Sequence, residues 1–179
     1  MSNDNAASDA PAGPTAVLAD DERLMREQLR ARLAEVWPEL QVVAEARNGT
    51  EAVELVEQHR PDVVFLDIRM PGLTGVEAAR RIAQMAPRTG SAPDGSFDDD
   101  LLPEIVFITA YDQYAVDAFE QGVADYVLKP AERERLQLTV TRIQQRLAAR
   151  RGANDAGGYE ASGYEAGEAA PPSPNLQQV

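Results

Sequence analysis

Between residues 16 and 151 the spacing of the hydrophobic residues changes repeatedly along the chain. Short runs in which almost every residue is apolar alternate with longer segments in which apolar residues recur every three or four positions. The first pattern predicts β-strands, and the second predicts amphipathic helices. The expected strands are 16–19, 40–46, 62–66, 105–108 and 124–128, and a helical pattern follows each of them.

Several of these helical patterns also have recognisable ends. The first stops before Pro38 and the second before Pro61, because proline cannot continue a helix, and Gly122 is a typical terminator for the fourth. The turn signal Asn48-Gly49 precedes the second pattern. The residues that mark the five helical faces are Met25, Leu29, Leu33 and Val36; Ala52, Leu55, Val56 and His59; Val76, Ala79, Ala83 and Ala86; Ala115, Ala118 and Phe119; and Leu136, Val140, Ile143 and Leu147.

The strand at 62–66 indicates the type of sheet. Its apolar residues are continuous rather than alternating, which is typical of a strand buried on both faces in a parallel sheet. Five successive strand–helix units therefore predict the α/β class, a (βα)5 doubly wound five-stranded parallel sheet. In such sheets ligands bind at the carboxyl ends of the strands.

Composition divides the chain of 179 residues into a folded part and two tails. Hydrophobic residues make up 44% of the chain, enough for one core of ordinary size. Residues 1–15 and 152–179 are rich in Ala, Gly, Ser and Pro and contain acidic but no basic residues. We therefore expect a disordered leader at 1–15, a domain at 16–151, and a disordered segment at 152–179, which is either the linker of a fragment, the interpretation we favour, or the tail of a stand-alone domain.

The charge and the absent residue types exclude several classes of protein. Thirty Asp and Glu against seventeen Lys and Arg give a net charge of -13, which argues against direct nucleic-acid binding by this chain. The absence of cysteine excludes disulfides and thiolate metal sites. No apolar run approaches the ~20 residues that span a bilayer, and no secretory signal is visible. We expect a cytoplasmic protein without membrane contact.

Polar residues whose side chains can take part in a reaction follow four of the predicted strands. Asp20 and Asp21 follow the first strand, Asp67 the third, Thr109 the fourth and Lys129 the fifth. This set is typical of phosphoryl transfer to a carboxylate, with Asp67 as the nucleophile. Gathered carboxylates need a counter-charge, and Mg²⁺ is suitable because it prefers oxygen ligands. Lys129 and Thr109 can then bind phosphoryl oxygens.

Four segments carry a resemblance to a known family. VLADDE, VVFLDIRMPGLTG, FITAYD and DYVLKP occur in this order, each at the end of a predicted strand. Over residues 16–150 the chain resembles the CheY-like receiver domain of two-component response regulators. The segment FITAYDQYAVDAFEQGVADYVLKP is most similar to LytTR-type DNA-binding response regulators. The resemblance implies a flavodoxin-like strand order, 2-1-3-4-5.

The resemblance also implies roles for individual residues. A sensor histidine kinase phosphorylates Asp67, and Mg²⁺ is held by Asp20, Asp21, Asp67 and the backbone carbonyl of Arg69. Further residues implied by the family are Thr109 and Tyr126 as a switch pair, Lys129 as a phosphoryl ligand, and a cis peptide bond between Lys129 and Pro130.

The implied function is that of a switch rather than of a dedicated enzyme, although such a domain catalyses its own phosphotransfer and dephosphorylation. Phosphorylation would reshape the face formed by the fourth helix, fifth strand and fifth helix. We expect this face to mediate a phosphorylation-dependent homodimer. The switch would control a DNA-binding output domain beyond residue 179.

Other interpretations remain open. Asp67 can be a turn residue, Asp20 and Asp21 can cap a helix, and Tyr126 can serve in packing alone. A haloacid-dehalogenase-like phosphatase also uses an aspartyl nucleophile, but its Asp-x-Asp pattern is absent, since Arg69 stands two positions after Asp67. A receiver-like binding module that never takes phosphate is a third possibility.

The long connection at 87–104 departs from the family pattern. We interpret it as a tolerated surface insertion at the amino end of the fourth strand, with a partner-binding patch as the alternative.

Overall fold

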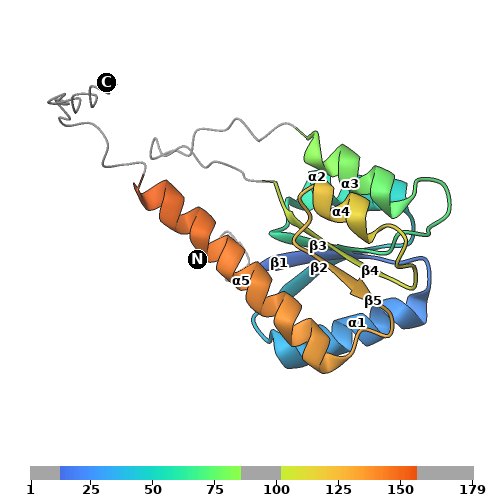
Figure 1. The fold of residues 1–179 in the computed structure, drawn as a ribbon, viewed down its shortest axis with the longest axis horizontal. Helices are drawn as coiled ribbons and strands as arrows, with labels where there is room; N and C mark the ends of the chain where they lie inside the picture. The colour runs from blue at the N-terminus through green and yellow to red at the C-terminus, as the bar shows by residue number, and fades with distance from the viewer. Residues whose placement is uncertain (1–12, 86–101, 157–179) are drawn as a thin grey trace, which may run out of the picture.

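The computed structural model describes residues 13–85 and 102–156, which form a five-stranded sheet covered by helices on both faces (Figure 1). The strands are β1 (Thr15–Ala19), β2 (Gln41–Ala46), β3 (Val63–Leu66), β4 (Glu104–Thr109) and β5 (Asp125–Leu128). The helices are α1 (Arg23–Val36), α2 (Gly49–His59), α3 (Gly75–Ala83), α4 (Ala115–Glu120) and α5 (Arg133–Ala156).

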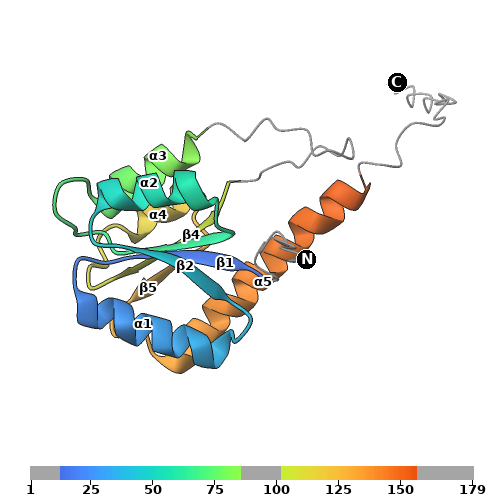
Figure 2. The ribbon, with the colours of Figure 1, turned by 180° about the vertical axis from the view of Figure 1, so that it is seen from behind.

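The sheet has the predicted topology. All strand pairs are parallel, and the order across the sheet is β2-β1-β3-β4-β5. Helices α1 and α5 cover one face, and α2, α3 and α4 cover the other, as the two opposite views show (Figures 1 and 2). The doubly wound flavodoxin-like fold predicted from the sequence is confirmed.

The continuous apolar strands are explained by two cores, one on each face of the sheet. Along β3, Val64 and Leu66 join the core under α2 and α3, whereas Val63 and Phe65 join the core under α1 and α5. All four of these side chains are buried. A strand with alternating polar and apolar residues would place polar side chains in one of these two cores. The sequence of β3 is therefore apolar at every position.

Local capping residues set the starts of the helices on the α2–α3 side. The Asn48 side chain accepts a hydrogen bond of 2.8 Å from the backbone N–H of Glu51 and so caps α2. Thr74 and Glu77 form a reciprocal capping box at the start of α3. These caps fix the loops that precede α2 and α3, and the second of these loops follows Asp67.

The last helix differs most from the sequence-based expectation. It continues to Ala156, past the boundary expected at residue 151, although residues 152–156 were assigned to a disordered tail. Ion pairs from Arg146 and Arg150 to Glu104 join the second half of α5 to the sheet. Most of the expected leader and tail and most of the connection at 87–104 lie outside the described residues, as does Ala86. None of the helices within the described ranges combines the length and hydropathy needed to cross a membrane.

Candidate functional site

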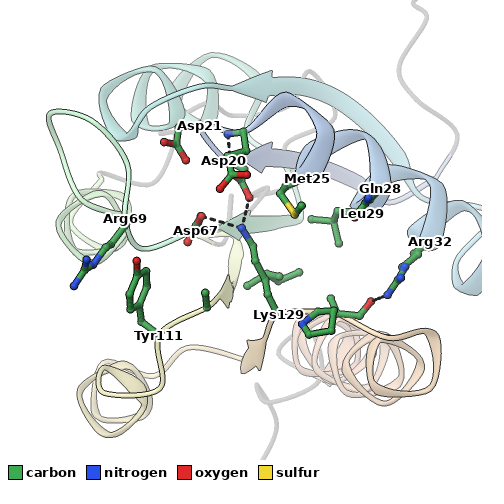
Figure 3. Close-up of a pocket in the computed structure, with 15 residues that line it drawn as sticks. Asp20, Asp21, Met25, Gln28, Leu29, Arg32, Asp67, Arg69, Tyr111 and Lys129 are labelled. Carbon is green, nitrogen blue, oxygen red and sulfur yellow. Dashed lines mark hydrogen bonds and ion pairs between the residues drawn. The ribbon is translucent and has the colours of Figure 1, made fainter.

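The acidic residues predicted at the strand ends meet at one edge of the sheet (Figure 3). Strands β1 and β3 are neighbours, so Asp20 and Asp67, which follow them, lie side by side. The backbone N–H of Asp67 donates to the carbonyl of Ala19 over 2.8 Å, which extends this pairing to the start of the acidic loops. Both carboxylates are buried, with residue exposures of 6% for Asp20 and 7% for Asp67.

Lys129 enters this edge from the end of β5 and bridges the two buried carboxylates. Its ammonium nitrogen lies 2.7 Å from Asp20 Oδ2 and 3.0 Å from Asp67 Oδ2 (Figure 3). Burial acts to lower the pKa of Lys129, but the hydrogen bonds to Asp20 and Asp67 outweigh it, so the pKa is raised above its ordinary value. The lysine is therefore charged and supplies the counter-charge that two buried acids require. The Lys129–Pro130 peptide bond is cis.

Asp21 completes the acidic group on the solvent side. Carboxylate oxygens of Asp20, Asp21 and Glu22 lie within 4.8 Å of one another. Partial burial and the charge of Asp20 raise the pKa of Asp21 above its ordinary value. A cluster of hard oxygen donors with an excess of negative charge is the donor set that Mg²⁺ prefers.

The loop between β1 and α1 is held by hydrogen bonds that differ from a helix cap. Asp20 Oδ1 accepts from the backbone N–H of Glu22 over 2.9 Å, and Arg26 donates to the Asp20 carbonyl over 2.6 Å. The cap position of α1 is occupied by Glu22, which makes no side-chain capping bond. The acids at 20 and 21 therefore do not serve as the cap of this helix.

The backbone around Asp67 is closely packed. Asp67 Oδ1 accepts from the backbone N–H of Ile68 over 2.7 Å, and the N–H of Gly75 donates to the carbonyl of Ile68 over 2.7 Å. A Cβ atom on Gly75 would lie only 2.0 Å from the carbonyl oxygen of Asp67. Glycine is thus required where the first turn of α3 meets the loop that carries the carboxylate.

Thr109 is the last residue of β4, and Tyr126 lies on the adjacent strand β5, where it pairs with Phe107. Thr109 is fully buried, and its hydroxyl oxygen accepts a long hydrogen bond of 3.4 Å from the backbone N–H of Tyr111. Tyr126 points inward, packs against Phe107 with ring centroids 6.0 Å apart, and donates its hydroxyl to the Tyr111 carbonyl. Burial raises the pKa of Tyr126 above its ordinary value. Tyr126 therefore has the contacts of a packing residue while it also ties the β4–α4 loop to β5.

A cavity of about 570 Å³ opens beside the carboxylates. Its wall combines Asp20, Asp67 and Lys129 with Met25 and Leu29 of α1 (Figure 3). The sequence pattern predicted Met25 and Leu29 as core positions, but in the structure both are only half-buried and line the cavity. Helical periodicity shows that a residue faces the sheet, but it does not show whether the space in front of that residue is filled.

Two side chains at the mouth of the cavity were not predicted to interact. The guanidinium carbon of Arg69 lies 3.9 Å from the centroid of the Tyr111 ring, in cation–π geometry. The sequence predicts that Arg69 and Tyr111 flank the site and that the backbone carbonyl of Arg69 binds the metal ion, but it does not predict a contact between their side chains. Nothing in the local pattern indicates such a stack, because the two residues belong to loops after different strands.

Comparisons with known proteins agree with this architecture. The family model for the response regulator receiver domain matches residues 16–141. An uncharacterized response regulatory protein of Vibrio cholerae serotype O1 is 51% identical over 133 residues, covering 74% of this chain and 46% of that protein. The transcriptional regulatory protein BtsR of Escherichia coli (strain K12) is 40% identical over 129 residues, covering 72% of this chain and 47% of BtsR.

The chain spans about half the length of the curated relatives that it matches. Among solved structures, the response regulatory domain of mrkE from Klebsiella pneumoniae is similar, with a TM-score of 0.61 and 28% identity. That match covers 73% of this chain and 95% of the other.

Proposed function

This chain belongs to the response regulator receiver domain family, and on that premise we propose that Asp67 accepts a phosphoryl group from a sensor histidine kinase. The observation that carries the proposal is the Lys129 ammonium, which bridges the carboxylates of Asp20 and Asp67 at the mouth of a cavity. Receiver domains of response regulators are regulators rather than dedicated enzymes, and the proposed chemistry serves a switch.

The reaction follows from the positions of three side chains. A carboxylate oxygen of Asp67 forms a bond to phosphorus while the bond from phosphorus to the kinase imidazole breaks, and the electron pair returns to the imidazole nitrogen. The Lys129 ammonium already touches Asp67, so it can move onto a phosphoryl oxygen with little displacement. The Thr109 hydroxyl can donate to a second phosphoryl oxygen. Attack by water on the same phosphorus would reverse the modification.

Asp20, Asp21, Asp67 and the backbone carbonyl of Arg69 would hold a Mg²⁺ ion. The donor set supports this assignment, because the clustered carboxylates exceed the single ammonium in charge. When bound, the ion would neutralise negative charge on the transferred phosphoryl group. The acids of this chain orient the ion, and Lys129 holds Asp20 and Asp67 together before it arrives.

The output surface that we propose is the face formed by α4, β5 and α5. Thr109 would turn toward the phosphoryl group, and Tyr126 would follow into the space that it leaves. Each of these three elements exposes large apolar side chains: Val116 (71%) and Phe119 (51%) on α4, Leu128 (48%) on β5 and Leu138 (65%) on α5. Such residues favour a contact with a second copy of the domain or with an output domain. Sedimentation with and without beryllofluoride tests dimerisation, and an unchanged mass would contradict it.

A DNA-binding output domain of LytTR type is a further part of the proposal. The relative BtsR is a transcriptional regulatory protein of which this chain covers less than half. We propose a receiver unit over residues 16–151 with a leader at 1–15 and a linker or tail at 152–179.

Incubation with acetyl phosphate and Mg²⁺, followed by intact mass spectrometry, tests the central claim. We expect one added phosphoryl group, its mapping to Asp67, and its loss in Asp67→Asn. No label on the parent protein, or an equal label on Asp67→Asn, would overturn the proposal. Steady turnover of a phosphomonoester that depends on Asp67 would favour a phosphatase instead.

A further inference from the structure

Two buried carboxylates lie at the amino ends of β4 and β5, at the edge of the sheet opposite to the cavity. Glu104 is the first residue of β4 and is 3% exposed, and Asp125 is the first residue of β5 and is 1% exposed. Both face α5, which runs from the cavity side of the domain past the amino edge of the sheet (Figures 1 and 2). Neither acid takes part in the chemistry proposed above.

Asp125 binds the first half of α5. Arg135 donates to both carboxylate oxygens over 2.8 and 2.9 Å, and Thr139 and Arg142 donate over 2.7 and 3.0 Å. Burial acts to raise the pKa of Asp125, but the hydrogen bonds from Arg135 and Thr139 outweigh it and lower the pKa. This half of the helix is also held by the apolar residues Leu136, Val140 and Ile143, which are fully buried.

Glu104 binds the second half of α5. Arg146 Nε lies 2.7 Å from one carboxylate oxygen of Glu104, and Arg150 Nη2 lies 2.6 Å from the other. Arg150 also donates to the backbone carbonyl of Leu102 over 2.7 Å. One buried acid thus holds two consecutive turns of the helix against the start of β4.

The apolar contact of α5 ends where this ion-pair cluster begins. Leu147 is the last large apolar side chain of the helix and is only half-buried, and the residues after it are Ala, Arg, Gly, Asn and Asp. Gly152 lies inside the helix, where glycine costs about 1 kcal/mol relative to alanine. An end with this composition would fray if it were held by helix propensity alone.

We propose that Glu104, through Arg146 and Arg150, anchors the last turns of α5 and so fixes the direction in which the chain leaves the domain. The 24 residues of α5 form a rod of about 36 Å at 1.5 Å per residue. Anchored at both halves, this rod presents whatever follows residue 156 in one orientation relative to the sheet. The inference goes beyond the proposed phosphoryl transfer and does not depend on it.

Pulsed electron spin resonance on the full chain tests the anchor directly. The chain contains no cysteine, so two introduced cysteines can be labelled without a background. Gly152→Cys places one label where a Cβ meets open space, and Gln58→Cys places the other on an exposed position of α2. With native Glu104 we expect a narrow distribution of label distances. In Glu104→Gln we expect the distribution to broaden about twofold or more, because an unanchored helix end frays.

Glu120→Gln is the matched control, since it removes the same charge at an exposed position of α4. Its distance distribution should remain narrow. Arg150→Gln leaves Glu104 paired with Arg146, so it should fold even if Glu104→Gln does not, and it should broaden the distribution to an intermediate width. Widths in Glu104→Gln and Arg150→Gln equal to that of Glu120→Gln would overturn the proposal. If Glu104→Gln does not fold, the width in Arg150→Gln decides.

Discussion

Substitution of Gly75 tests how tightly the first turn of α3 holds Asp67. In Gly75→Ala the added methyl group would lie 2.0 Å from the carbonyl oxygen of Asp67 and 2.8 Å from the Cα of Ile68. Ordinary contact of a Cβ begins at 3.4 Å, so one of the two segments must move by about 1.4 Å. The neighbouring atoms belong to the backbone and cannot rotate away.

Both stability and chemistry should respond to this shift. Overpacking of a well-packed site costs about 1–3 kcal/mol, and we expect the upper part of that range because the contacts are with backbone. A displacement of about 1 Å at a reacting group costs roughly 10²-fold in rate. We therefore expect Gly75→Ala to lower the free energy of unfolding by about 3 kcal/mol and the rate of Asp67 labelling about 100-fold.

Urea denaturation measures the first quantity, and the time course of labelling by acetyl phosphate measures the second. Gly152→Ala is the control, because its methyl group meets open space inside a helix and should raise stability by about 0.5–1 kcal/mol. Unchanged unfolding and labelling in Gly75→Ala would refute the argument that this glycine positions the carboxylate.

Three further substitutions address single contacts. Asp125→Asn should lower the unfolding free energy at neutral pH by about 2 kcal/mol, since it leaves Arg135 and Arg142 without their buried partner. Because the pKa of Asp125 is lowered in the folded state, the contribution of this carboxylate to the free energy of unfolding is complete above about pH 4. The contribution is lost as the pH falls through the lowered pKa. Urea denaturation at several pH values should therefore show that the stability of the variant depends less on acid than that of the parent. Tyr126→Phe removes the hydroxyl that donates to Tyr111 and should cost about 1 kcal/mol, with Asp67 labelling unchanged. Mg²⁺ at 100 times its dissociation constant should stabilise the parent by about 2.7 kcal/mol, and Asp21→Asn should reduce this effect. If Mg²⁺ raises the melting temperature of Asp21→Asn as much as that of the parent, Asp21 is not a ligand of the ion.

The strands and the residues that follow them could be predicted because each depends on a local pattern. A run such as Val63–Leu66 is buried wherever it lies, and parallel strands bring Asp20, Asp67 and Lys129 to one edge without any knowledge of the loops. The strand order, in contrast, was predicted from the family resemblance and not from local patterns. Periodicity alone does not say which strand is central.

The features that could not be predicted depend on residues far apart in the sequence. Arg146 of α5 pairs with Glu104, which lies 42 positions away, while the local composition from residue 152 favours a tail. Met25 faces the sheet as its spacing predicts, but it lines a cavity, and the spacing of apolar residues does not show whether another side chain fills the space in front of it. The stack of Arg69 on Tyr111 likewise joins two loops that no spacing rule relates.

The placement of the two ends of the connection between α3 and β4 has a practical consequence for protein engineering. Ile82 and Ala83 of α3 line the same small cavity as Leu102 and Pro103, so the segment between them leaves and re-enters the fold at neighbouring points. Each doubling of such a segment's length costs only about 0.6 kcal/mol. This edge is remote from the carboxylates of Asp20 and Asp67. A fluorescent reporter or an affinity tag inserted here should therefore leave the proposed phosphorylation of Asp67 intact while it reports the location or concentration of the domain.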